Sequence, residues 1–163
     1  MIRELEEKDC AGIAEIYNHY IRNSLISFET HEIDSDEILA RVKKSRALGL
    51  YWLVYEDNDQ IIGYTYASQW NARGAYKNTV EVSIYLSPDA VGNGRGSMLY
   101  SELFKRLHNE SLHTAIGCIA LPNPESVGLH EKFGMKKVAH FSEVGYKFGQ
   151  WIDVGYWQVS LNA

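Results

Sequence analysis

The stretch Val91-Gly-Asn-Gly-Arg-Gly-Ser-Met-Leu-Tyr100 places three glycines at alternate positions between an apolar strand pattern and a helical pattern. Because glycine lacks a side chain, the backbone can turn tightly there and present successive N–H groups to an anion at the start of the following helix. No Lys-Ser/Thr pair closes the stretch and no βαβ nucleotide repeat precedes it, so two common phosphate motifs do not fit. The pattern predicts an anion-binding loop of another kind, or a simple tight turn.

Composition and charge limit the class of protein. The chain has 163 residues, of which 45% are hydrophobic and 23% charged, enough for one substantial core. We therefore expect a single domain over residues 1–163. The net charge of −5 and the dispersed basic residues argue against a protein that binds nucleic acid through its phosphates.

The cysteines and the N-terminal sequence bear on location. Cys10 and Cys118 form no CxxC pair and no Cys/His cluster, so the sequence predicts neither a disulfide framework nor a metal site. Residues 1–8 alternate apolar and charged side chains, unlike a secretory signal, and no later run is long enough to span a bilayer. We expect a cytoplasmic protein with no metal, no nucleic-acid partner and no membrane contact.

Hydrophobic periodicity predicts the element order β α α β β β α β α β β. The expected strands are 2–5, 51–55, 60–69, 79–86, 114–120, 136–147 and 151–161. The expected helices run from a cap at Asp9 to Asn23, from Asp34 to about Ser45, from about Gly96 to Asn109 and from Glu125 to Phe133. The fully apolar strand 114–120 suits the centre of a sheet. This order predicts an α+β fold with a mixed, mostly antiparallel twisted sheet, helices on both faces and one parallel step across the glycine-loop helix.

The glycine stretch resembles the pyrophosphate loop of the GNAT superfamily of acyl-CoA-dependent N-acetyltransferases, Gln/Arg-x-x-Gly-x-Gly/Ala. The matching residues are 91–96, with Val91 where the family has Gln or Arg. Asn123-Pro-Glu-Ser126 and Leu129-His-Glu-Lys-Phe-Gly-Met135 resemble the family's Asn-x-x-Ala/Ser…Tyr-x-x-x-Gly-Phe segment. Segments 70–76, 87–88 and 145–157 are similar to the phosphinothricin and methionine-sulfoximine acetyltransferase branch. The resemblance implies a GNAT-like fold, a homodimer, acetyl-CoA as co-substrate and a small amino-acid analogue as acceptor.

The resemblance also implies which residues hold acetyl-CoA. The backbone of Ile84, Tyr85 and Leu86 would face the pantetheine arm and the acetyl carbonyl. The loop would bind the pyrophosphate mainly through backbone N–H groups, with the residues Gly92, Asn93, Gly94, Arg95, Gly96 and Ser97. Asn123 would hydrogen-bond the cofactor arm, and Lys132 would approach the cofactor. A turn asparagine and a solvated helix lysine are the simpler alternatives for these two.

Acetyl transfer to an amine needs a base for the amine and a proton for the departing thiolate. An α-amine with a reference pKa of about 7.7 to 8.0 is mostly protonated near neutral pH. Glu81, in the strand that leads into the loop, is the candidate base, and an exposed strand glutamate is the alternative. His130 stands where many GNAT enzymes have a tyrosine that protonates the thiolate. A packed or capping histidine is the alternative there.

For the acceptor, Arg73 is the candidate carboxylate-binding residue, because a guanidinium binds a carboxylate through paired hydrogen bonds. Phe28, Trp70 and Tyr76 would wall the pocket, unless they serve core or dimer packing. The leading hypothesis is acetylation of the α-amine of phosphinothricin, methionine sulfoximine or methionine sulfone. A GNAT enzyme for a polyamine, an aminoglycoside or a peptide N-terminus, and a noncatalytic acyl-CoA-binding sensor, remain as alternatives.

Overall fold

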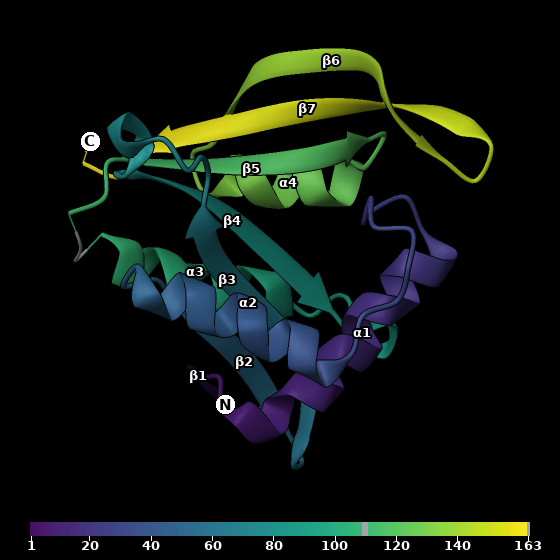
Figure 1. Ribbon diagram of the computed structural model, residues 1–163, viewed down its shortest axis with the longest axis vertical. Coiled ribbons are helices and arrows are strands. Elements are labelled where there is room, and N and C mark those ends of the chain that lie inside the picture. Colours follow the sequence, from purple (N-terminus) through teal and green to yellow (C-terminus); the bar gives the residue numbers. More distant parts are fainter. Residues whose placement is uncertain (109–110, 163) are drawn as a thin grey trace.

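The computed structural model describes residues 1–108 and 111–162, which form one seven-stranded sheet with four α-helices (Figure 1). The strands are β1 (Ile2–Glu4), β2 (Trp52–Asp57), β3 (Gln60–Gln69), β4 (Thr79–Leu86), β5 (Thr114–Leu121), β6 (Lys136–Lys147) and β7 (Gln150–Ser160). The helices are α1 (Cys10–Asn23), α2 (Ser35–Ala47), α3 (Arg95–Leu107) and α4 (Pro124–Lys132). The predicted order of elements is confirmed. The expected helix end at Asn109 lies outside the described residues, as does Ala163.

The sheet has the order β1-β2-β3-β4-β5-β7-β6, and the only parallel neighbours among its described strands are β4 and β5. The chain reaches β5 from β4 through α3, which is the parallel step that the sequence predicted. β5 lies between β4 and β7, as expected for the fully apolar strand. The α+β class and the mostly antiparallel sheet are therefore confirmed.

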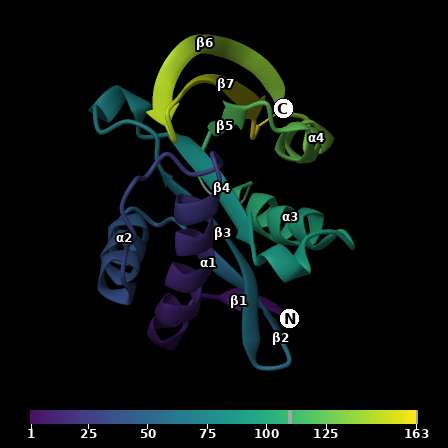
Figure 2. The same cartoon turned by 90° about the vertical axis from the view of Figure 1, so that its right-hand side faces the viewer.

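Helices cover both faces of the sheet, with α1 and α2 on one side and α3 and α4 on the other (Figure 2). Strand alternation explains the two separate cores, because successive side chains point to opposite faces. Trp52 and Val54 pack with α1 and α2, whereas Leu53 between them packs with α3. Within α3, the side chains of Leu99, Leu103 and Leu107 are completely buried, at the four-residue spacing of one helix face.

The sheet opens between its two parallel strands. β4 pairs with β5 only over Thr79 to Glu81, opposite Thr114 to Ile116. Beyond Glu81, β4 continues along β3 while β5 continues along β7, and the two strands diverge (Figure 1). The edge of β4 that faces the opening therefore carries backbone groups that are available to a ligand.

Asp9 departs from its expected role. It occupies the N-cap position of α1, but its side chain makes no capping hydrogen bond to that helix. Its carboxylate instead accepts two hydrogen bonds from Arg3, at 2.7 and 3.0 Å, and one from the Glu6 backbone at 2.8 Å. A paired, charge-assisted contact is stronger than a single capping bond, so the contact with Arg3 forms in place of the helix cap.

None of the described helices is long and apolar enough to cross a membrane.

Candidate active site

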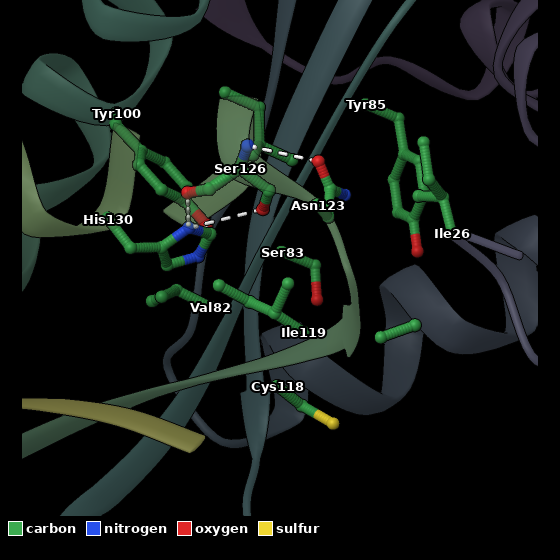
Figure 3. A pocket seen from close by; sticks show the side chains of 12 residues that line it. Ile26, Val82, Ser83, Tyr85, Tyr100, Cys118, Ile119, Asn123, Ser126 and His130 are labelled. Carbon is green, nitrogen blue, oxygen red and sulfur yellow. Dashed lines mark hydrogen bonds between the residues drawn. The ribbon is translucent and has the colours of Figure 1, made fainter. Parts of the chain in front are cut away.

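A small cavity of about 50 Å³ lies in the opening between β4 and β5 (Figure 3). Val82 to Tyr85 of β4 form one wall, and Cys118 to Ala120 of β5 form the other. α4 with its N-cap and α3 complete it with the side chains of Asn123, Ser126, His130 and Tyr100. Four elements, together with Ile26 from the segment between α1 and α2, thus meet where the two strands separate.

A larger cavity of about 390 Å³ adjoins the first, because both are lined by Ile26, Ser83, Tyr85, Cys118 and Ala120. It lies on the α1 and α2 side, where its other walls are Tyr17, Ser27, Phe28, Glu29, Tyr66, Glu81 and Val154. Several of these side chains are aromatic, and the carboxylates belong to two glutamates. This cavity is large enough for a small polar molecule beside the opening.

Glu81 is the last residue of β4 that pairs with β5, and it lies opposite Ile116. Its half-buried side chain lines the larger cavity at the point where the strands begin to diverge. Burial disfavours the charged form and raises the pKa of Glu81 above its ordinary value. A carboxylate with a raised pKa is a stronger base once it is ionised, so this position suits proton abstraction.

His130 is buried on α4, and both of its ring nitrogens have partners (Figure 3). Nδ1 lies 2.7 Å from the Ser126 carbonyl oxygen, and Nε2 lies 2.9 Å from the Tyr100 hydroxyl oxygen. Because a carbonyl only accepts, Nδ1 carries the proton and Nε2 accepts from Tyr100. Burial lowers the pKa of His130, so its ring is neutral near pH 7. The O–H donor of this pair belongs to Tyr100.

Gly117 on β5 lets the imidazole of His130 lie against the sheet. A Cβ at this position would lie only 2.6 Å from Cδ2 of the His130 ring and 2.8 Å from Nε2. Contacts that short do not occur between real side chains, so any larger residue would displace the histidine. The pair of His130 and Tyr100 therefore depends on a glycine in the neighbouring strand.

The glycine loop turns with three successive left-handed residues, Gly92 (φ 96°), Asn93 (φ 55°) and Gly94 (φ 73°). Gly94 is the N-cap of α3, so the loop and the first turn of the helix expose N–H groups together. The side chain of Val91 is half exposed and apolar, so it offers no hydrogen-bond donor to an anion. Gly96 differs, because it lies within the first turn of α3 and a Cβ there would meet Leu129 at an ordinary 3.4 Å.

Two predicted cofactor residues outside the loop, Asn123 and Lys132, lie at the two ends of α4. Lys132 at the end of α4 donates a hydrogen bond to the Ser97 hydroxyl at 3.0 Å, which brings a cation beside the start of α3. Asn123 caps α4, since its side-chain oxygen accepts from the Ser126 backbone N–H at 3.2 Å. Its side-chain nitrogen, with two N–H donors, is the group that can serve a ligand in the small cavity.

Of the predicted acceptor residues, Phe28 lines the larger cavity together with Glu81. Trp70 and Tyr76 instead pack edge to face, with ring centroids 5.2 Å apart, at the two ends of the loop that follows β3. Arg73 is exposed within this loop, outside the residues that line the two cavities. The structure thus brings Phe28 to the candidate base and leaves the other three on a neighbouring surface.

Comparison with known proteins identifies the family. Residues 2–155 match the family model described as an acetyltransferase (GNAT) domain. The chain belongs to the GNAT acetyltransferases. It is 36% identical over 163 residues to a phosphinothricin N-acetyltransferase from Streptomyces coelicolor, covering 98% of this chain and 95% of that one. It is 33% identical to an L-methionine sulfoximine/L-methionine sulfone acetyltransferase from Salmonella typhimurium, covering 99% and 94% of the two chains.

A solved structure agrees with this assignment. A putative acetyltransferase from Salmonella typhimurium, determined with its cofactor acetyl-CoA, superposes with a TM-score of 0.96 at 33% identity and covers 99% of this chain and 94% of its own. This GNAT enzyme is therefore an N-acetyltransferase with the family's fold, and the family uses acetyl-CoA. The left-handed loop, the open edge of β4 and Lys132 fit a ligand that carries a pyrophosphate and an extended amide arm.

Four polar side chains of the small cavity were not among the residues that we expected in the acetyltransferase site: Ser83, Tyr100, Cys118 and Ser126. Ser83 follows Glu81 by two residues in a strand and so shares its face, a relationship that the sequence contained. Tyr100 and Cys118 carry no such indication. In the sequence they belong to an apolar helix face and an apolar strand, and only the tertiary structure brings them to the wall of one cavity.

Proposed function

We propose that this GNAT enzyme transfers the acetyl group of acetyl-CoA to the α-amine of a small amino-acid analogue such as phosphinothricin, methionine sulfoximine or methionine sulfone. The observation that carries the proposal is the half-buried carboxylate of Glu81, which lines a cavity of about 390 Å³ where β4 and β5 separate. The acceptor class is supported by the printed functions of relatives that are 33% to 36% identical over nearly the whole chain.

Glu81 serves as the base in this proposal. Its carboxylate takes the proton of the acceptor ammonium, directly or through a water molecule, and leaves a neutral nitrogen that can attack a thioester. The raised pKa of Glu81, which follows from its burial, makes its carboxylate a stronger base. Its side chain is half-buried, and partial burial strengthens electrostatic interactions with a bound amine.

Tyr100 and His130 serve the departing thiolate. Tyr100 lines the small cavity, and Nε2 of His130 fixes the orientation of its hydroxyl. A hydroxyl can turn from one acceptor to another, so Tyr100 can donate a hydrogen bond to a thiolate that forms beside it. His130 then holds the tyrosine ring in place and provides an acceptor within the same network.

The residues that would hold acetyl-CoA lie on the glycine loop, the first turn of α3, the edge of β4 and the two ends of α4. Gly92 to Gly94 and the first turn of α3, with Arg95, Gly96 and Ser97, would hold the pyrophosphate through backbone N–H groups. The edge of Ile84 to Leu86 would bind the pantetheine amides, and Asn123 and Lys132 would contact the same ligand from α4. For the acceptor, Phe28 would form one wall, while Arg73 would bind the carboxylate from the loop after β3, with Trp70 and Tyr76 beside it.

We further propose that the enzyme is a homodimer and works in the cytoplasm. The outer strand β6 and its hairpin with β7 expose large apolar side chains at Val138, Phe141, Val144, Tyr146, Phe148 and Trp151. Clusters of exposed aromatic residues are typical of subunit interfaces. Both cysteines are free thiols, which supports a reducing compartment. Sedimentation of the purified protein tests the dimer.

The decisive experiment measures the release of free CoA. The protein is incubated with acetyl-CoA and, in separate reactions, with methionine sulfoximine, methionine sulfone, phosphinothricin, spermidine or an aminoglycoside. We expect thiol release with the amino-acid analogues, at a rate that depends on their concentration. Turnover confined to spermidine or the aminoglycoside would reassign the acceptor. Binding of acetyl-CoA without turnover on any amine would indicate a sensor.

A further inference from the structure

The irregular segment 24–29 between α1 and α2, here called the strap, forms one wall of both cavities. Ile26 lines the small and the large cavity, whereas Ser27, Phe28 and Glu29 line the large one. The strap lies across the site from Glu81, which is on β4. Its position therefore decides how much room an acceptor has beside the candidate base.

Lys147 ties the strap to β6. This lysine is 5% exposed, and its ammonium donates hydrogen bonds to the Ser24 carbonyl at 2.8 Å and to the Ser27 carbonyl at 2.6 Å. Burying an ammonium is costly unless hydrogen bonds replace its water, and charge-assisted bonds of this kind are strong. The contacts join segments about 120 residues apart, so they hold the strap to a distant part of the sheet.

Gly145 provides the second tie, two residues before Lys147 on the same face of β6. A Cβ at Gly145 would lie 2.4 Å from Cε2 and 2.6 Å from Cζ of Phe28. The aromatic ring of the strap thus lies directly on the backbone of β6, where only glycine leaves space for it. Phe28 and Lys147 pair the two segments at neighbouring points, one through packing and one through hydrogen bonds.

The other contacts of the strap lead back to the helices beside it. The Glu29 carboxylate pairs with the Arg41 guanidinium of α2 at 2.6 and 2.9 Å. The Ser27 hydroxyl donates to the Tyr17 hydroxyl of α1 at 3.0 Å. These contacts hold the strap to α1 and α2. The contacts of Lys147 and Gly145 hold it to β6, and so set how far it lies from β6 across the cavity.

We propose that Lys147 and Gly145 are positioning residues for the acceptor. They hold Ile26 and Phe28 at the position that sets the size of the larger cavity, where the acceptor would bind. This inference rests on the proposed acetyl transfer to a small amino-acid analogue. The pyrophosphate-binding candidates of the glycine loop and α3 lie on the opposite side of the sheet from the strap (Figure 2). Within the strap, Ile26 shares the small cavity with the acetyl-CoA candidates Ile84 and Asn123, whereas Phe28 lines the larger cavity only. Loosening the strap should therefore affect the acceptor much more than acetyl-CoA.

The test is the variant Lys147→Met, which keeps the length of the side chain and removes its donors. We expect the KM for methionine sulfoximine to rise roughly tenfold and the KM for acetyl-CoA to change by less than about twofold, because Phe28 lines the larger cavity only and the glycine loop that would hold the pyrophosphate is untouched. Lys147→Arg retains a cationic donor and should recover much of the loss. Lys136→Met, at an exposed lysine in the same strand, is the matched control and should match the wild type.

A second measurement follows the strap without any turnover. The backbone N–H groups of Ile26 and Glu29 donate to the Ser24 and Ser27 hydroxyls at 3.2 and 3.3 Å. In Lys147→Met, hydrogen exchange at these two amides should accelerate, while exchange in α3 stays at the wild-type rate. Gly145→Ala, which displaces Phe28, should show the same pattern and also accept a longer amino acid relative to methionine sulfoximine.

The outcomes separate this inference from the proposed function. A wild-type protein that acetylates none of the amino-acid analogues would overturn the proposed function, and with it the acceptor role of Lys147 and Gly145. An active wild type whose Lys147→Met and Gly145→Ala variants keep the acceptor KM would overturn the inference alone. So would faster exchange in the strap accompanied by an equal rise in both KM values, since the effect would then not be specific to the acceptor.

Discussion

The hydroxyl oxygen of Tyr100 lies 2.9 Å from Nε2 of His130, and this contact joins the helix that follows the glycine loop to the helix that follows β5. Both residues are buried, and both line the small cavity between the diverging strands. His130 uses its other nitrogen to donate to the Ser126 carbonyl at 2.7 Å. The pair is therefore a fixed donor and acceptor unit on the wall of the site.

Replacement of Tyr100 by phenylalanine tests this unit. The variant keeps the ring but removes the hydroxyl, so we expect kcat to fall by about tenfold to a hundredfold with small changes in both KM values. Steady-state kinetics with methionine sulfoximine measure this. Tyr55→Phe, which removes a hydroxyl from β2, is the control. An unchanged kcat in Tyr100→Phe would mean that another group serves the thiolate.

The lowered pKa of His130 predicts a pH dependence of stability. Because the folded state binds the imidazole proton less tightly than the unfolded state, the contribution of His130 to folding is fully present above its unfolded pKa of about 6.5. It is lost as the pH falls through the lower folded-state pKa. Thermal melting between pH about 7 and pH about 5 should show a decline that is shallower in His130→Gln. Equal slopes in the two proteins would show that other groups cause the decline.

Replacement of Glu81 by glutamine should reduce turnover without reducing stability. The variant lacks a base, so kcat/KM should fall by about a hundredfold near pH 7, and the deficit should shrink above pH about 8, where the α-amine loses its proton unaided. Initial rates across pH measure this. A parallel reduction at every pH would argue for a binding role instead.

The same variant has a predicted effect on unfolding. A raised folded-state pKa means that the Glu81 contribution is complete below the unfolded pKa of about 4.3 and is lost as the pH rises through the folded value. Glutamine has no such loss. We therefore expect Glu81→Gln to melt at a higher temperature than the wild type at pH 7 and at a similar temperature near pH 4, by calorimetry.

The glycine loop permits a comparison between two neighbouring glycines. Gly94 has a left-handed φ of 73°, whereas Gly96 is within α3 and has ordinary space for a Cβ. Gly94→Ala should strain the loop and raise the KM for acetyl-CoA by about tenfold, and Gly96→Ala should change it by less than about twofold. Equal effects in the two variants would show that the left-handed turn is not what binds the cofactor.

Replacement of Arg73 tests which residue binds the carboxylate of the acceptor. If its guanidinium binds the acceptor carboxylate, Arg73→Ala should raise the KM for methionine sulfoximine by about tenfold and leave the KM for acetyl-CoA unchanged. Lys77→Ala, at an exposed cation that follows the same loop, controls for a general loss of positive charge. An acceptor KM that is equal in wild type and Arg73→Ala would assign carboxylate binding to another residue.

Much of the architecture could be predicted because it depends on local patterns. The leucines of α3, at four-residue spacing, and the alternation along β2 specify which faces are buried whatever else the chain does. Element bounds differ by only a few residues from those expected. Asp9 shows the limit, because its choice between the helix cap and Arg3 depends on where β1 lies.

The candidate site residues also divide into those that the sequence could predict and those that it could not. Glu81 and Phe28 were expected on separate grounds, and the structure brings them to one cavity. Tyr100 and the strap contact of Lys147 could not be expected, since a tyrosine in an apolar helix face and a lysine in a strand each have an ordinary explanation. Their roles arise from partners 30 or more residues away in the sequence.

The sequence by itself determined the order of elements, the tight turn at the glycine loop and the family resemblance, because each depends on residues close together in the chain. The tertiary structure decided where the parallel strands separate, which polar groups face that opening, and how the buried Lys147 holds segment 24–29 to β6. The physical reason is that burial and hydrogen-bond pairing depend on groups that only folding brings together. The alternating glycines indicated an anion, and the diverging strands beside them indicate how a thioester and an amine can meet.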